Sequence, residues 1–299
     1  MSQRTFAGGA IDARRGLGWL PDYPDLRDYT RESEAVEPLL ARTGVAKATA
    51  KRSPKAAAKA DLREWCSPIE DQGQIGSCTA HAGVGMLEYF ERKLHGKHLD
   101  GSRRFLYKVT RALGELEGDS GAFLRTTIGA MVLFGVPPES HWPYSEAEFD
   151  DEPPPFCYAF AQNYQAVKYY RLDPPETERS DLLAAIKSHL ASQLPAMFGF
   201  TVYDSIADAG DDGRIPFPAG GDNVAGGHAV MAVGYDDALE IPNRDGKSKG
   251  AILIRNSWSR SWGEDGYGWL PYDYVTEGLA EDWWVLIDSE WVDTGEFET

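Results

Sequence analysis

Apolar residues recur at helical spacing through much of the first 195 residues. The clearest case runs from Ser77 to about Leu94, where apolar side chains return every three or four positions. Gly96 follows directly, and a glycine there is typical of a helix end. Three further stretches predict helices: 105–113, 126–134 and 182–190.

After about residue 195 the pattern changes to short, β-rich apolar runs separated by Gly, Asp and Pro. These runs predict strands at 196–202, 229–235, 251–255 and 282–287. A helical part followed by a stranded part is typical of an α+β protein. We therefore expect two lobes with a cleft between them, mainly helical over about 61–195 and mainly β, barrel-like, over about 196–290.

The first 60 residues differ from the rest of the chain. Residues 1–30 are rich in Gly, Pro and Asp, and the repeated prolines predict an extended segment. Four apolar side chains in it are candidates to anchor the segment in a groove: Trp19, Leu20, Tyr23 and Leu26. Residues 31–60 contain a basic, Ala- and Lys-rich run of low complexity, which predicts a flexible linker. The globular domain is then expected over 61–299.

Composition narrows the class of function. The chain has 299 residues and a formal charge of −17, which argues against nucleic acid or an anionic membrane as partner. No apolar run reaches the roughly 18 residues of a membrane span, and the N-terminus has no secretory signal. We expect a cytoplasmic monomer, unless the sequence is already processed or exported without a signal. Three cysteines make no disulfide framework, although Cys66 and Cys157 could pair.

One cysteine has the setting of a nucleophile. Cys78 follows Gly76-Ser77 at the start of the predicted helix, where the helix dipole favours a thiolate. It needs an imidazole from elsewhere, and His228 opens an apolar strand directly after two glycines. His81 lies on the same helix as Cys78 and is more consistent with packing. The other four histidines are assigned to solvent, a surface helix face or local packing: His95, His98, His189 and His141.

Two amides complete the candidate site. Asn256 ends an apolar strand, where asparagine is most often a turn residue. It could instead hold the imidazole of His228 in the reactive tautomer, with Trp258 shielding that hydrogen bond. Gln72 precedes the nucleophile and could donate to an oxyanion together with the N–H of Cys78.

These motifs in this order resemble those of the papain family of cysteine peptidases, whose local signature and long spacing are a known pattern. The resemblance covers roughly residues 61–290 and implies a papain-like two-lobed fold and hydrolysis of polypeptides through a thioester. It implies that Cys78 is the nucleophile, His228 the base and then the acid, Asn256 the orienting residue and Gln72 the oxyanion donor. The resting pair would be thiolate and imidazolium.

The resemblance also implies where substrate binds. Ser120, Gly121 and Gly227 would line the cleft, with backbone hydrogen bonds from Gly121 to an extended peptide. Trp262 would form part of the wall on the leaving-group (primed) side. No cofactor is implied, and no Cys/His cluster has metal-ligand spacing.

The long helical propeptide of many family members is missing from this sequence, and Thr79 and Ile75 depart from the common pattern. The chain is similar to a bacterial branch typified by xylellain, which implies that residues 1–30 cover the cleft and inhibit the enzyme. Two alternatives keep the fold: acyl transfer to an amine, and an inactive peptide-binding module.

Overall fold

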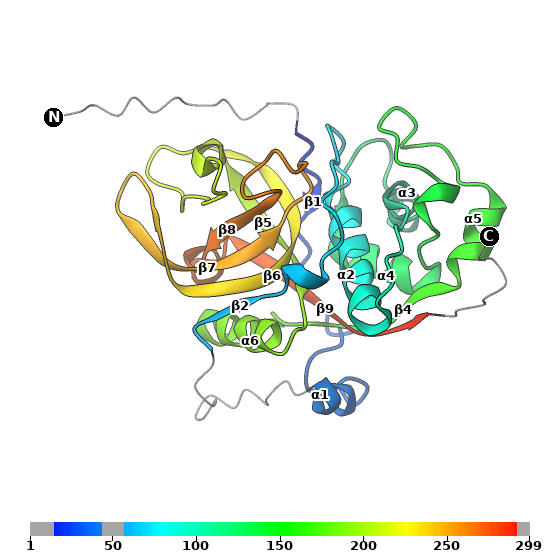
Figure 1. Ribbon diagram of the computed structural model, residues 1–299, viewed down its shortest axis with the longest axis horizontal. Coiled ribbons are helices and arrows are strands. Elements are labelled where there is room, and N and C mark those ends of the chain that lie inside the picture. The colour runs from blue at the N-terminus through cyan, green and yellow to red at the C-terminus, as the bar shows by residue number, and fades with distance from the viewer. Residues whose placement is uncertain (1–14, 44–56, 292–299) are drawn as a thin grey trace.

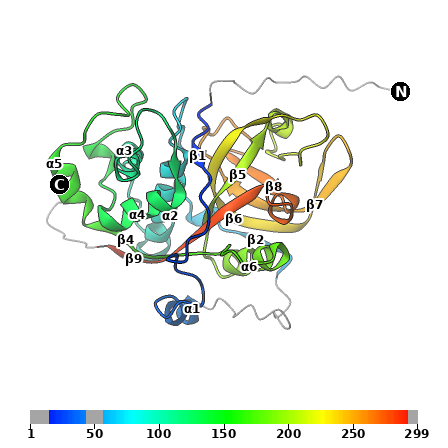
Figure 2. The same ribbon diagram turned by 180° about the vertical axis from the view of Figure 1, so that it is seen from behind.

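The computed structural model describes residues 15–43 and 57–291, and these form two lobes with β1 (Trp19–Leu20) running between them (Figures 1 and 2). The central part of the expected linker, 44–56, lies outside the described residues, as do 1–14 and 292–299. No helix in the described ranges has the length and apolar character needed to cross a membrane.

The helical lobe is built around α2 (Cys78–His95), which is buried along most of its length. It packs against α3 (Arg103–Leu113) and α4 (Leu124–Leu133), and α5 (Pro155–Ala161) lies at the outer edge of the lobe, against β4. Gly96 ends α2 in the left-handed conformation, with φ 66°, as the sequence predicted. Ser102 caps α3 by accepting a hydrogen bond from the N–H of Phe105. The helix ends that the sequence predicted are confirmed to within about three residues.

The second lobe is an antiparallel sheet in the order β4-β9-β5-β6-β7-β8, and β2 pairs separately with β6. The path begins at β4 and ends at β8, so this α+β fold contains an open sheet and not a closed barrel. The strand bounds are β2 (Lys59–Asp61), β4 (Tyr164–Arg171), β5 (Ala196–Tyr203), β6 (Val224–Pro242), β7 (Lys247–Arg255), β8 (Tyr267–Pro271) and β9 (Ala280–Trp291).

The long strand β9 joins the two lobes. It pairs with β4 beside the helices and with β5 inside the sheet, where Met197 lies opposite Trp284. The rings of Phe198 and Trp283 stack at 3.8 Å in the core. The remaining elements are β3 (Ala122–Phe123), α6 (Arg179–Ala191), α7 (Asp273–Thr276) and 3-10 turns at Arg63–Trp65, Glu139–His141 and Asp204–Ala209.

Several expectations need correction. Helix α1 (Glu37–Thr43) lies inside the range predicted as linker, because Val36 and Leu40 are one helical turn apart and both are buried. Helix α6 lies in the range assigned to the helical lobe but packs against β6. His189 on α6 is buried, with Nδ1 at 2.6 Å from the carbonyl oxygen of Ala185, so its assignment to a surface face was wrong.

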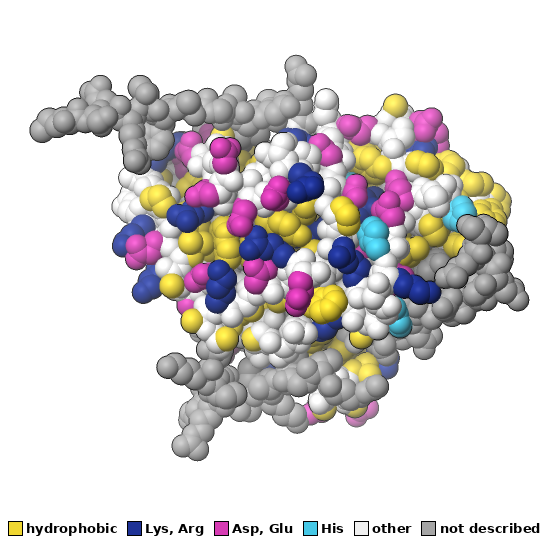
Figure 3. Space-filling model, viewed as in Figure 1, with side chains coloured by type: hydrophobic (Ala, Val, Ile, Leu, Met, Phe, Trp, Pro, Cys, Tyr) yellow, Lys and Arg dark blue, Asp and Glu magenta, His cyan; other side chains and the backbone are white. Residues whose placement is uncertain are grey.

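A buried ion pair fixes α2 against α3. Both carboxylate oxygens of Glu88 accept hydrogen bonds from Nη2 of Arg103 at 2.9 Å, and both side chains are almost fully buried. Glu88 also accepts from the N–H of Gly101. Many other charges pair at the surface, and Figure 3 shows acidic and basic side chains interspersed on one face. The pair at Glu88 is costly to break because it has no access to water.

We expect Glu88→Ala to lower the free energy of unfolding by about 3–5 kcal/mol, since Arg103 would stay buried without its main partner. Urea unfolding followed by tryptophan fluorescence measures this. The control is Glu240→Ala, which removes an exposed pair with Lys247 and should cost less than about 1 kcal/mol. Equal losses for the two variants would contradict the role given to Glu88.

Candidate active site

Cys78 is the first residue of α2 and is fully buried. Its Sγ accepts a hydrogen bond from the N–H of Ala229 at 3.4 Å. Ala229 follows His228 on β6, so the strand brings the imidazole to the N-terminal end of α2. The positive end of the α2 dipole adds to the polarity around the sulfur.

The imidazole of His228 is held from its far side. Its Nε2 lies 2.8 Å from Oδ1 of Asn256, which also accepts the N–H of Ser257 at 2.8 Å. Because an amide oxygen only accepts, this contact places the ring proton on Nε2 and leaves Nδ1 as the acceptor. Nδ1 is buried and has no hydrogen-bond partner within the described part of the chain. The indole of Trp258 stacks on the ring at 4.5 Å.

The side-chain amide of Gln72 is oriented by its neighbours. Its Oε1 accepts the hydroxyl of Ser257 at 2.6 Å, and its backbone N–H donates to the carbonyl of Ser257. Nε2 is therefore turned toward the cleft, where it donates to the carbonyl oxygens of Gly16 at 2.9 Å and Ile75 at 3.0 Å. Ser257 was not singled out from the sequence, because a serine beside Asn256 has no distinctive pattern.

Residues 15–20 of the N-terminal segment lie against this site. The N–H of Gly16 donates to the carbonyl of Gly73, and the carbonyl of Gly18 accepts the N–H of Ala122 at 2.8 Å. Trp19 and Leu20 then pair in parallel with β3. Figure 2 shows this strand passing between the lobes beside α2.

The contact is so close that only glycine fits at several positions. A Cβ on Gly18 would lie 2.0 Å from the carbonyl oxygen of Gly76, far inside van der Waals contact. A Cβ on Gly16 would lie 2.0 Å from the carbonyl oxygen of Ile75, and one on Gly121 would lie 2.2 Å from that of Gly18. The two backbones therefore meet without intervening side chains.

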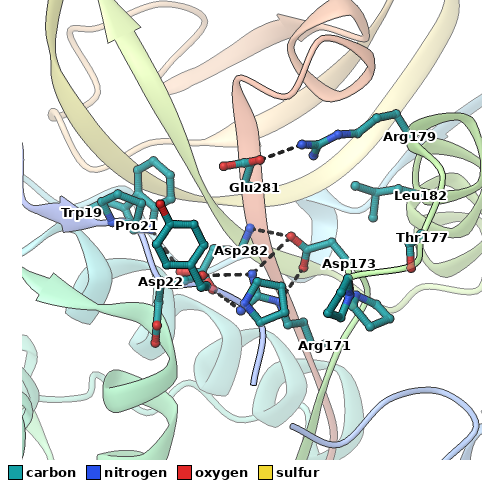
Figure 4. A pocket seen from close by; sticks show the side chains of 14 residues that line it. Trp19, Pro21, Asp22, Arg171, Asp173, Thr177, Arg179, Leu182, Glu281 and Asp282 are labelled. Carbon is teal, nitrogen blue, oxygen red and sulfur yellow. Dashed lines mark hydrogen bonds and ion pairs between the residues drawn. The ribbon is translucent and has the colours of Figure 1, made fainter. Parts of the chain in front are cut away.

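Trp19 fills a recess in the floor of the cleft. Its ring occupies the place that a Cβ on Gly199 would take, and its Nε1 donates to Oδ2 of the buried Asp282 at 3.1 Å. A cavity of about 490 Å³ continues beyond the ring (Figure 4). Arg171 pairs with Asp282 and Asp173 inside it. The anchoring role expected for Trp19 fits this placement.

Two of the other expected anchors, Tyr23 and Leu26, do not pack into the groove, whereas Leu20 pairs with Phe123. Tyr23 is 90% and Leu26 100% exposed, because the turn between Asp25 and Asp28 carries both side chains outward. Ion pairs hold this part of the segment instead, because the guanidinium of Arg125 binds the carboxylates of Asp22 and Asp28. The apolar pattern of this segment was a poor guide, since half of its apolar side chains face water.

Burial sets the protonation of the covered site. It raises the pKa of Cys78 to about 11 and lowers that of His228 to about 4, because neither charged form is solvated. Neutral thiol and neutral imidazole therefore prevail near pH 7. Burial thus acts against the expected thiolate–imidazolium pair while the site is covered.

The residues expected to bind substrate lie around the N-terminal segment. Gly121 contacts Gly18, and a Cβ on Gly227 would lie 2.5 Å from the carbonyl oxygen of Trp19. Ser120 donates its hydroxyl to the carbonyl of Gly121 at 3.1 Å. Trp262 lies apart from these residues and packs edge-on against Trp258 at 5.4 Å.

Other candidates play structural parts. His81 is buried with Nδ1 at 3.1 Å from the carbonyl of Ser77, in line with packing. Cys66 and Cys157 are both free, so the pairing left open by the sequence is not formed. No group of three or more potential metal ligands occurs in the described ranges. Asp119 accepts a hydrogen bond from the N–H of Gly76 at 2.8 Å and so holds the turn before Cys78, a part that the sequence did not indicate.

Comparison with known proteins gives consistent results. The sequence pattern described as papain family cysteine protease matches residues 56–282. An uncharacterized peptidase C1-like protein of Acanthamoeba polyphaga mimivirus is 34% identical over 91% of this chain and 86% of its own length. Cysteine proteinase 1 of Entamoeba histolytica is 28% identical over 72% of this chain and 63% of its own.

Solved structures agree. Xylellain, a cysteine protease from Xylella fastidiosa, superposes with a TM-score of 0.70 at 34% identity, covering 91% of this chain and 96% of its own. Bromelain from Ananas comosus, at 19% identity, has a TM-score of 0.56 over 77% of this chain and 99% of its own, which shows a shared fold.

We expect Cys78 in the full chain to react slowly with iodoacetamide at pH 7, with a rate that rises as the pH approaches about 11. The reason is that only thiolate reacts and burial keeps the thiol protonated. Mass spectrometry of the peptide that carries Cys78, with Cys78→Ser as control, measures the rate. Fast alkylation already at pH 6 would contradict a covered, neutral thiol.

Proposed function

Because the chain belongs to the papain family of cysteine proteases, we propose that Cys78 is the nucleophile of a peptidase whose cleft is covered by its own N-terminal segment. The chain acts on polypeptides, as its family does. One observation carries the assignment of roles: Nε2 of Gln72 already binds a peptide carbonyl, that of Gly16, at 2.9 Å. That carbonyl marks where the scissile carbonyl of a substrate would lie.

The proposed reaction starts from the neutral pair. Nδ1 of His228 takes the proton of Cys78, and the sulfur attacks the scissile carbonyl carbon. The oxyanion accepts hydrogen bonds from Gln72 Nε2 and the N–H of Cys78. When the C–N bond breaks, the imidazolium gives its proton to the leaving amine and a thioester remains. Water, deprotonated by His228, then attacks the thioester and releases the acid and the thiol.

Asn256 acts on this sequence through His228. Its Oδ1 accepts the Nε2 proton in both protonation states of the ring, so the imidazole keeps its orientation while Nδ1 exchanges its proton. Trp258, stacked on the ring, keeps water from competing for that hydrogen bond. Ser257 has the corresponding supporting part for Gln72.

Residues 15–20 are proposed to inhibit rather than to serve as substrate. The backbone N–H of Gly18 is one of the groups that act to lower the pKa of Cys78, so an amide nitrogen of the segment lies near the nucleophile. The carbonyl oxygen of Gly16, in the same segment, accepts the hydrogen bond from Nε2 of Gln72 that an oxyanion would accept. The segment therefore excludes substrate from both parts of the site at once.

Contacts outside the cleft hold the segment in place. Arg125 on α4 binds Asp22 and Asp28, and Arg171 on β4 donates to the carbonyl of Asp22. Helix α1 follows, and residues 44–58 connect it covalently to β2. We infer that this tether keeps the covering residues at high effective concentration over the cleft.

Of the two alternatives, an inactive binding module is disfavoured because the four candidate catalytic side chains are present and mutually oriented. Acyl transfer to an amine has no specific observation in its favour.

We expect Gly18→Ala in the full chain to raise the rate of peptide hydrolysis about tenfold or more. The new Cβ would lie 2.0 Å from the Gly76 carbonyl oxygen, so the segment must leave, and the rate scales with the uncovered fraction. A fluorogenic peptide assay measures the rate. The control is Leu26→Ala, which changes a fully exposed residue of the same segment and should leave the rate at its wild-type value. An unchanged rate in Gly18→Ala would remove the case for autoinhibition.

In the Gly18→Ala background, we expect Gln72→Ala to lower kcat about 10²–10³-fold, as loss of one oxyanion donor does. The matched control is Gln74→Ala, an exposed glutamine two positions along, which should change kcat little. Cys78→Ala should abolish turnover. If Gln72→Ala and Gln74→Ala had the same kcat, Gln72 would not be the oxyanion donor.

A further inference from the structure

Two carboxylates, Asp71 and Glu146, border the cleft where the N-terminal segment enters it. Oδ1 of Asp71 accepts a hydrogen bond from Nη1 of Arg15 and another from the N–H of Gly73 at 3.0 Å. Glu146 accepts the N–H of Gln74 at 2.7 Å, and its carboxylate lies where a Cβ on Gly73 would be. Both carboxylates therefore flank Gly73, and the guanidinium of Arg15 pairs with the carboxylate of Asp71.

The order of contacts along the N-terminal segment shows where Asp71 and Glu146 lie relative to the scissile bond. Gly16 puts its carbonyl at the Gln72 amide, and Gly18 lies against Gly121. Arg15 therefore lies beyond the oxyanion donor, on the side away from Gly121. Trp258 borders the same side, because its backbone forms an antiparallel β-bridge with that of Asp71.

The expected role of Trp262 supports the same placement. Its ring packs on Trp258, and Trp262 is the residue that the papain resemblance assigns to the leaving-group side. Asp71 and Glu146 thus lie next to the part of a substrate that follows the scissile bond.

We propose that Asp71, with Glu146 beside it, selects substrates that carry a basic residue just after the scissile bond. The proposal rests on the proposed function, because it takes Arg15 as the occupant that substrate replaces. When the segment leaves, Arg15 leaves with it, and Asp71 loses the basic partner it has among the described residues. A lysine or arginine of the substrate would restore that ion pair, whereas a glutamate would be repelled by two carboxylates and by a chain of net charge −17.

The expected size of the preference for a basic substrate follows from the exposure of the Asp71 side chain. The side chain of Asp71 is 45% exposed, so water and salt screen the interaction. We expect the ratio of kcat/KM for a basic over a neutral substrate to be about three- to fivefold, in the range of exposed ion pairs.

The test uses the full chain with Gly18→Ala, so that the cleft is open. Two fluorogenic peptides are identical before the scissile bond and carry either Arg-Arg or Gln-Gln after it. Adding Asp71→Asn should bring the ratio of kcat/KM for Arg-Arg over Gln-Gln close to one, while hydrolysis of the Gln-Gln peptide persists. Asparagine keeps the oxygen that accepts the Gly73 N–H, so the loop conformation is preserved.

The matched control is Glu240→Gln on β6, which makes the same change in net charge at an exposed pair with Lys247 on β7 and should keep the ratio. The ratio should also fall as ionic strength rises. A ratio near one in Gly18→Ala itself, or one that Asp71→Asn leaves as high as Glu240→Gln does, would overturn the proposal while leaving the peptidase assignment intact. If Gly18→Ala hydrolysed neither peptide, the proposed function would fail together with it.

Discussion

The contact between the backbones at Gly18 and Gly76 is the constraint on which the covered site depends. With no side chain between them, the N-terminal segment comes close enough for its carbonyl at Gly16 to reach the amide of Gln72 and for its amide at Gly18 to reach the thiol. The same closeness sets the position of Trp19, whose ring would otherwise not reach Asp282. Any side chain at Gly18 would remove all of these contacts together.

Covering the site changes its chemistry as well as its access. Water is excluded from Cys78 and His228, so burial favours the neutral thiol and the neutral imidazole. Uncovering would return solvent to both groups and bring their pKa values toward the ordinary range, which favours proton transfer from sulfur to nitrogen. One displacement of the segment would thereby open the cleft and promote the reactive ion pair.

The elements that form the candidate site were predictable because their signals are local. A glycine-flanked cysteine before an apolar helix, a histidine at a strand start and an asparagine at a strand end each have their own sequence context, and the structure brings them together. The path of residues 15–29 was less predictable. Whether Tyr23 or Trp19 is buried depends on a turn and on the distant Arg125, and neither is encoded in apolar spacing. His189 and helix α1 were misassigned for the same reason, since their burial depends on partners far away in the sequence.

Amide hydrogen exchange at Ala122, followed by NMR in the full chain, tests most directly whether the segment occupies the cleft. The N–H of Ala122 donates to the carbonyl of Gly18, so it should be protected in the wild type and exchange rapidly in Gly18→Ala. The N–H of Leu172, which donates to Trp283, should stay protected in both and serves as the reference. Exchange at Ala122 that is equally fast in the wild type and in Gly18→Ala would contradict a cleft covered by residues 15–20.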